Sequence, residues 1–256
     1  MALFPESYDR LLPPIELRAD GDDVNNQSLA LIKGTFKVLD LLDLDDVEST
    51  FDIFFKLDVK WYDVNLKYQF LHDLNPKNAF APEALSKMWK PSIQFIHIAK
   101  NDDVIYLGET IFVKKGNGSV RLSGGLDTLH VHEVYAGAEN PIHLRFRRKM
   151  KFFCPFKNIK NYPFGKEQCS LHFYIRGIAN RLTEFDCRMV APEYQSVGQY
   201  VVSLWTIGSS EKDGEKVISV TMTLDRSFSS IFLVTYLPTV TSSEIFFFPF
   251  SPPFRS

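Results

Sequence analysis

Apolar and polar residues alternate with a period of two along most of this chain. Between residues 51 and 60 every odd position is apolar, and most even positions carry a charge. Residues 30–38 and 218–224 show the same alternation. Because successive side chains of a strand point to opposite faces, the pattern predicts strands with one buried face and one mostly polar face.

Turn-forming residues separate these stretches. Residues 115–118, which include two glycines and an asparagine, join strand-like stretches on either side. Residues 212–215 lie between two further alternating stretches and predict a β-hairpin with a polar tip. Helices are expected only at residues 6–12 and 82–88, the second starting at a proline. Many short strands with frequent turns indicate a β-sandwich or a barrel.

The composition excludes several classes of protein. Of the 256 residues, 45% are apolar and 23% charged, as in a globular protein with a core. The net charge of −2 argues against nucleic-acid binding. No hydrolase, metalloprotease or nucleotide-binding motif is present, so we expect no enzymatic activity, no catalytic residue and no cofactor. His130 and His132 could share a strand face, but without a third ligand nearby we expect a solvated face rather than a metal site.

Three features bear on the cellular compartment. Cys154 and Cys169 are too far apart for a CxxC motif, and a disulfide would indicate an oxidising compartment. Asn26 and Asn117 begin glycosylation sequons. Residues 1–6, however, lack the basic start and apolar run of a signal peptide.

Several separated segments, in order along the chain, resemble subunits of Cys-loop receptors, the pentameric ligand-gated ion channels. The stretch from Cys154 through Tyr162-Pro163-Phe164 to Cys169 resembles the signature disulfide loop of that family. Residues 61–66 resemble its W-x-D-x-R-L stretch, and residues 89–92 its W-x-P-D stretch. Residues 225–226 and 235–239 resemble the end of its last extracellular strand and the first turn of its first membrane helix.

The resemblance implies an all-β fold, a ten-strand antiparallel β-sandwich with a short N-terminal helix. The sandwich would span residues 1–227, with an incomplete start of the first membrane helix at 228–240 and a divergent tail at 241–256. Neither apolar run after residue 230 is long enough to span a bilayer by itself. Cys154 would be bonded to Cys169, which leaves Cys187 as a small buried side chain.

The implied function is that of an extracellular neurotransmitter-binding domain. A small-molecule ligand would bind where subunits meet in a homo- or hetero-pentamer, and binding would be coupled to pore opening. A complete subunit would lie in the plasma membrane with this domain on the extracellular face, whereas a truncated form would be secreted or retained. The alternatives are a soluble ligand-buffering protein of the same fold, a non-functional truncated product, or an unrelated all-β adhesion or carbohydrate-binding sandwich.

Basic residues mark a candidate ligand site. His143, Arg145, Arg147 and Lys149 alternate along one stretch, which the resemblance assigns to the complementary side of the ligand cleft. Such a face could hold a carboxylate, and arginine offers it bidentate hydrogen bonds. The alternatives are a solvated face or an ion-pair partner for the next subunit.

An aromatic cage for a cationic amine is not expected. Family positions that usually face the cleft are filled here by other residues, namely Lys56, Asp58, Arg176 and Ile178. Three aromatic residues remain candidates for ligand contact, with ordinary packing as the alternative: Tyr174, Tyr200 and Trp205.

A second group is expected to couple the sandwich to the channel. In the family, an arginine near the membrane pairs with acidic residues between the first two strands. Here Arg226 would face Asp45 and Asp46, beside the loop tip formed by Tyr162, Pro163 and Phe164. The alternative is a surface ion pair that contributes less than about 1 kcal/mol.

Overall fold

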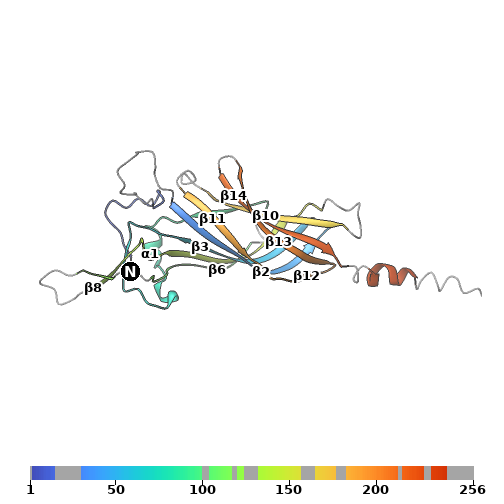
Figure 1. Ribbon diagram of the computed structural model, residues 1–256, viewed down its shortest axis with the longest axis horizontal. Helices are drawn as coiled ribbons and strands as arrows, with labels where there is room; N and C mark the ends of the chain where they lie inside the picture. The colour runs from blue at the N-terminus through green and yellow to red at the C-terminus, as the bar shows by residue number, and fades with distance from the viewer. Residues whose placement is uncertain are drawn as a thin grey trace, which may run out of the picture.

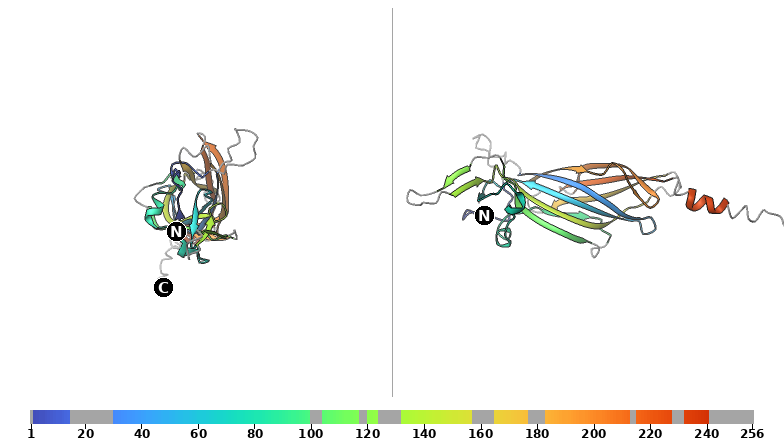
Figure 2. Two further views of the ribbon diagram at one scale, coloured as in Figure 1. Left: turned by 90° about the vertical axis from the view of Figure 1, so that its left-hand side faces the viewer. Right: turned by 90° about the horizontal axis from the view of Figure 1, so that it is seen from below.

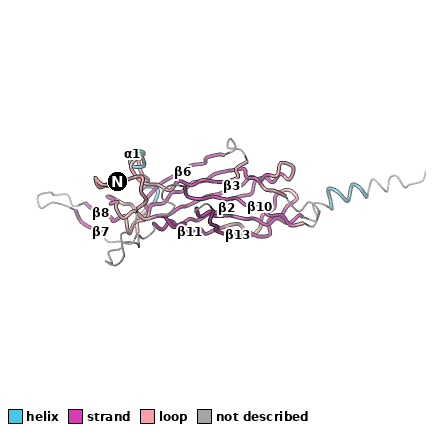
Figure 3. The backbone as a smooth tube through the Cα atoms, turned by 90° about the horizontal axis from the view of Figure 1, so that it is seen from above, coloured by secondary structure: helices cyan, strands magenta, loops and turns pink. Residues whose placement is uncertain are grey.

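The computed structural model describes residues 2–14, 30–99, 104–116, 120–123, 132–156, 165–176, 183–212, 215–227 and 232–240. Strands dominate, so the all-β prediction is confirmed. Figures 1 and 2 show an elongated sandwich with a small sheet beside the N-terminus and a short C-terminal helix at the opposite end. Figure 3 shows that the long strands run along the length of the molecule.

Two five-stranded sheets form the sandwich. The first has the order β11-β2-β3-β9-β6, and the second has the order β12-β13-β14-β10-β5. The strands of the first sheet are Thr183–Val190, Ala30–Asp45, Thr50–Trp61, Ile142–Phe153 and Ile105–Val113, in that order. Those of the second are Gln195–Val197, Tyr200–Lys212, Glu215–Arg226, Lys166–Arg176 and Ser92–Ile96.

Smaller elements lie at the two ends of the sandwich. A four-stranded sheet, β1-β4-β8-β7, consists of Ala2–Leu3, Lys67–Gln69, His132–Ala136 and Val120–Ser123. A 3-10 helix (Asn75–Asn78) and helix α1 (Pro82–Leu85) follow β4, and a π-helical turn covers Phe232–Tyr236. No helix in the described ranges is long and apolar enough to cross a membrane.

The predicted alternation is confirmed where it was clearest. Ile53, Phe55, Leu57 and Val59 of β3 have no exposed surface, while their even-numbered neighbours are mostly part-exposed. The predicted hairpin is also present, since β13 and β14 pair from Tyr200↔Arg226 to Lys212↔Glu215. Helix α1 begins at Pro82, as expected.

Phenylalanine rings join the two sheets. Phe36 of β2 stacks on Phe55 of β3, with 4.8 Å between ring centroids. It also stacks on Phe173 of β10 in the facing sheet at 5.7 Å, and Phe173 contacts Phe95 of β5 at 5.5 Å. Such ring pairs stabilise a core beyond the area that they bury.

The disulfide agrees with the prediction, whereas the free cysteine, Cys187, is only partly buried. Cys154 and Cys169 are bonded and fully buried, with their Cα atoms 4.9 Å apart. Burial raises the pKa of the Cys187 thiol to about 12, consistent with a packed, unreactive side chain. The loop tip at Tyr162, Pro163 and Phe164 lies outside the described residues, as do the sequons at Asn26 and Asn117 and the side chains of His130 and His132.

The predicted N-terminal helix is wrong. Residues 6–12 form turns, with a hydrogen bond from the Tyr8 amide to the Pro5 carbonyl at 3.1 Å. The Asp9 carboxylate accepts a hydrogen bond from the Leu11 amide at 2.8 Å. A side chain that binds a nearby backbone amide in this way competes with helix formation.

The expectation of a wholly antiparallel sandwich is also wrong. Strand β11 pairs with β2 in parallel, from Thr183↔Ala30 to Val190↔Lys37. It follows β10, which belongs to the opposite sheet, so no hairpin forces it to run antiparallel to β2. Gly34 makes the close pairing possible, because a Cβ there would lie 2.9 Å from the side chains of Phe185 and Cys187.

One buried network fixes the N-terminal segment. The Tyr8 hydroxyl donates a hydrogen bond to Asp63 at 2.7 Å and accepts one from the Trp89 amide at 3.0 Å. Asp63 is completely buried, and burial raises the pKa of its carboxyl. Tyr8 therefore links the N-terminal turns to the β3–β4 turn and to the segment before β5.

We expect Tyr8→Phe to lower the free energy of unfolding by about 1–3 kcal/mol, because Oδ2 of the buried Asp63 carboxylate and the Trp89 amide lose their hydrogen-bond partner, while Oδ1 of Asp63 keeps the Asn65 amide. Urea denaturation of the two proteins measures the difference. Tyr106→Phe is the control, since the Tyr106 ring is 68% exposed. An equal effect of the two substitutions would contradict this role for Tyr8.

Candidate functional site

The outer surface of the first five-stranded sheet is strongly basic. On β9, Ile142, Leu144 and Phe146 are buried, so the side chains between them lie on the outer face. The structure thus brings together on one face the four basic residues that the sequence indicated. We call this surface the basic face and define it by these outward basic residues of β2, β3 and β9, up to Lys149: Lys33, Lys37, Lys56, Lys60, His143, Arg145, Arg147 and Lys149.

Arg145 is held by a carboxylate on the neighbouring strand. Asp58 of β3 lies opposite Arg145, and its Oδ2 accepts a hydrogen bond from Nε at 2.9 Å and forms an ion pair with Nη2 at 2.8 Å. Nδ1 of His143 lies 2.8 Å from the other carboxylate oxygen. Burial alone would raise the pKa of Asp58, but the hydrogen bonds from His143 and Arg145 lower it below its ordinary value. Arg145 is therefore oriented and its charge is balanced.

An aromatic side chain completes this cluster. Phe112 of β6 stacks on His143, with ring centroids 5.3 Å apart and planes 11° apart. The guanidinium of Arg145 lies 4.9 Å from the centre of the same ring. This cation–π contact fixes the direction in which Arg145 leaves the sheet.

Three other cations form a row across the sheet. Lys37 of β2 lies directly opposite Lys56 of β3, which in turn lies opposite Arg147 of β9. Like charges in such pairs repel, since their Cβ atoms are about 4.5–5.5 Å apart. Within the described parts of the chain, none of the three forms an ion pair with a carboxylate. The row is therefore an excess of positive charge that an anion would relieve.

The titration of Lys56 reflects this crowding. Burial lowers its pKa most, and the nearby charges of Arg145, Arg147 and Lys37 lower it further, against the opposing effect of Asp58. By contrast, Lys149 lies 3.2 Å from Asp52 and is compensated. Among the described residues, Lys37, Lys56 and Arg147 thus have no carboxylate partner, and neither do Lys33 and Lys60, which lie opposite each other further along β2 and β3.

Tyr174, one of the predicted aromatic contacts, lies on the other sheet. It belongs to β10, and its hydroxyl donates a hydrogen bond to Gln94 at 3.0 Å. The outer face of this sheet is on the opposite side of the sandwich from the face that carries Arg145 and Arg147, so one chain cannot bring the three to a single ligand.

Tyr200 and Trp205 do not lie with the arginines either. Trp205 is partly buried against the core, after a β-bulge between Val202 and Leu204. Tyr200 is only 2% exposed. Tyr200 packs in the core, which was the alternative stated for it, whereas Trp205 is only partly buried and its contact with a ligand stays a prediction.

Tyr200 instead joins the residues predicted to couple the domain to a channel. Its hydroxyl donates to Asp46 at 3.2 Å, and its ring lies 4.7 Å from the guanidinium of Arg226. Nη2 of Arg226 is 3.8 Å from the same Asp46 oxygen. Asp45 accepts hydrogen bonds from the Val47 and Glu48 amides at 2.9 Å and so shapes the β2–β3 turn beside Asp46.

Sequence reasoning missed Lys37 and Phe112. Lys37 lies in a period-two stretch and Phe112 in the continuous apolar stretch 111–113, and only the pairing of β2 with β3 and of β6 with β9 brings them to the basic face. Cross-strand register between strands distant in sequence leaves no local signal.

The Asp58 cluster predicts a stability difference that depends on pH. Since the folded-state pKa of Asp58 is lowered, its contribution is complete above the ordinary aspartate pKa of about 4 and is lost as the pH falls through the folded value. Asp58→Asn should therefore lower the melting temperature at pH 7, and the gap to the wild type should narrow below about pH 4. Thermal denaturation of both proteins at several pH values measures this difference in melting temperature. The same narrowing with the exposed Asp40→Asn would contradict the assignment.

Comparison with known families identifies the family of this chain. The family described as the neurotransmitter-gated ion-channel ligand binding domain matches residues 2–178. The match extends from β1 past the end of β10 and includes the disulfide and the basic face. A comparison with curated proteins gives no match. The family match confirms the resemblance found in the sequence, and the chain belongs to the neurotransmitter-gated ion-channel ligand-binding domain family.

Proposed function

We propose that this chain is the extracellular ligand-binding domain of a ligand-gated channel subunit, and that its ligand carries an anionic group bound at the basic face. The row of Lys37, Lys56 and Arg147 carries this proposal. The three aligned cations have no carboxylate partner among the described residues. They repel one another, and a bound anion would reduce this repulsion.

The chemistry of the row favours a carboxylate. Arg147 is exposed and can bind a carboxylate through two parallel hydrogen bonds, whereas lysine acts as a point charge. Asp58 already occupies Arg145, so Arg145 borders the site as an oriented neighbour. A small neurotransmitter-like molecule with a carboxylate fits this arrangement, and an aromatic cage for a quaternary amine does not.

The second half of the site comes from a neighbouring subunit. The basic face and the outer face that carries Tyr174 are on opposite sides of the sandwich, which suits a ligand held between two chains. Edge strand β6 also exposes three large apolar residues, Ile105, Tyr106 and Leu107, at 49%, 68% and 53%. An edge strand with exposed apolar side chains can pair with, or pack against, another chain. The partner is another subunit of a homo- or hetero-pentamer.

Coupling to the pore runs through Asp46, Tyr200 and Arg226. Arg226 ends β14, and the described helical residues 232–240 follow soon after it. Ligand binding would shift the population of subunit arrangements, and this cluster would pass the shift to a membrane segment in a complete subunit at the plasma membrane. Asp45 and the tip residues Tyr162, Pro163 and Phe164 remain predicted members of the same contact.

The ligand proposal is tested in a receptor that joins this domain to the pore of a family member. We expect currents with carboxylate-bearing amino acids such as glutamate, glycine or γ-aminobutyrate, and none with choline. Arg147→Met and Lys56→Met should each weaken the response about 10-fold or more, since a charge-assisted hydrogen bond contributes about 1.5–3 kcal/mol. Lys90→Met, an exposed lysine outside the face, is the control. Activation by choline that is indifferent to both substitutions would refute an anionic ligand.

The coupling proposal is tested in the same receptor by a double-mutant cycle with Asp46→Asn and Arg226→Gln. Each single change should reduce the maximal current while ligand affinity changes little, and the double variant should be no worse than the more severe single one. Additive and small effects, as for a surface ion pair, would argue against coupling through this contact.

A further inference from the structure

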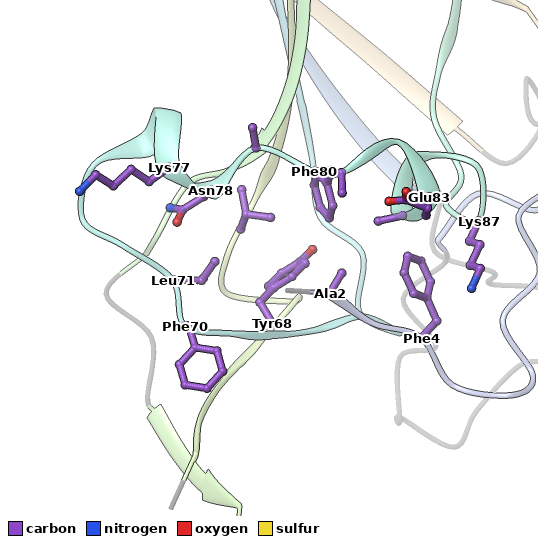
Figure 4. Close-up of a pocket in the computed structure, with 14 residues that line it drawn as sticks. Ala2, Phe4, Tyr68, Phe70, Leu71, Lys77, Asn78, Phe80, Glu83 and Lys87 are labelled. Carbon is purple, nitrogen blue, oxygen red and sulfur yellow. The ribbon is translucent and has the colours of Figure 1, made fainter.

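A hollow lies at the N-terminal end of the molecule, away from Asp46, Tyr200 and Arg226. It has a volume of about 370 Å³ and lies between strands β1 and β4 and helix α1 (Figure 4). The rings of Phe4, Tyr68 and Phe80 surround it, and Val113 of β6 contributes to its wall. Its size is within the range of small-molecule sites, which are about 300–1,000 Å³.

The lining offers mainly apolar contact. Alanine occupies positions 79, 81 and 84, where larger side chains would fill the space. The amide of Asn78 is already used, since it accepts from the His72 amide and donates to the His72 carbonyl at 2.8 Å. Glu83 and Lys87, of opposite charge, lie beside Phe4, and Lys77 points away from the hollow (Figure 4). This lining selects an uncharged molecule with flat apolar faces.

The two sides of the hollow are held with different strength. On one side the Phe80 amide donates to the Ile111 carbonyl at 3.0 Å, and Ala79 forms a β-bridge with Phe112. On the other side β1 is only two residues long and pairs with β4 at Ala2↔Tyr68 and Leu3↔Lys67. An occupant would contact both sides and so stabilise the short strand.

The fixed side of the hollow leads directly to the basic face. Val113 lines the hollow, and its neighbour Phe112 stacks on His143 and lies under Arg145. A change in the position of β6 at Val113 would therefore alter the contacts that Phe112 makes with His143 and Arg145 of the basic face. Such a chain of packed groups is the kind of path along which two sites can influence each other.

We propose that this hollow is a second small-molecule site, which binds compact uncharged aromatic compounds of one or two rings and is linked to the basic face through Phe112. The proposal does not depend on what the basic face binds, because its residues and its test are separate.

Indole is the probe, and the full chain is the protein. We expect saturable binding of indole, measured by calorimetry. Tryptamine and indole-3-acetate, which carry opposite charges, should each bind at least about 10-fold more weakly. In the indole complex the imidazole resonances of His143 should shift. The amide of Leu3 in β1 should exchange its hydrogen more slowly.

Variants of the alanines give matched controls. Ala84→Leu fills the hollow and should abolish indole binding, whereas Ala84→Ser keeps the space and should retain it. Ala81→Leu, at an exposed position, gives a second test if the helix does not tolerate leucine at position 84. Loss of binding in the leucine variants, with unchanged melting temperatures and retention in the serine variant, supports the site. Unchanged binding in both leucine variants, or no saturable binding up to the solubility limit of indole, overturns it. Binding without a shift at His143 overturns the link to the basic face.

Discussion

The packing of phenylalanine rings between the two five-stranded sheets determines which side chain of every strand faces outward. Once Phe36, Phe55 and Phe173 are stacked in the core, a strand cannot slip by one residue without exposing its whole apolar face. The outward residues are then in fixed register across the sheet. Lys37, Lys56 and Arg147 therefore lie side by side because of the core and not because of any attraction among them. The repulsion among these three cations is a free-energy cost of this register, and a bound anion would reduce it.

Arg148 shows that the inward and outward alternation of β9 continues even where an inward position carries a charged side chain. It occupies an inward position of β9, between the buried Phe146 and Met150. Its guanidinium lies 4.3 Å from the Phe146 ring centre, 4.6 Å from that of Tyr106 and 5.9 Å from that of Phe95. The β6 strand has an irregularity between Tyr106 and Glu109 at this place. The arginine is accommodated by aromatic faces and a locally distorted edge strand, so the alternation continues past it without a shift.

Local pattern was sufficient for the parts of the fold in which a strand alternates by itself. Strand β3 and the hairpin of β13 with β14 follow from period two and a polar turn, and these were predicted. The N-terminal turns were not, since the competition between Asp9 and the helix depends on one side-chain hydrogen bond. The parallel direction of β11 depends on a crossing between sheets, and the row through Lys37 depends on pairing between distant strands. The basic face was therefore predicted only for the residues of β9, and the residues that β2 and β3 add to it could not be found from one strand alone.

Strand β2, which contributes to the basic face, ends beside the cluster of Asp46, Tyr200 and Arg226. Lys37 and Asp45 are both in β2, and at about 3.3 Å per residue they are roughly 26 Å apart along it. Asp46, which contacts Tyr200 and lies near Arg226, is the next residue. Between these two points the pairing of β2 with β3 shifts twice, at Val38/Asp40 and at Leu41/Asp43. A bulge bends a strand and increases its twist locally, whereas the regular stretches on either side are held by their ladders. We therefore expect any bending between the basic face and Asp46 to be concentrated at these two irregularities. In the function proposed above, a ligand that pulls Lys37 towards a neighbouring chain would move the β2–β3 turn by changing the angle there rather than by deforming the aromatic core.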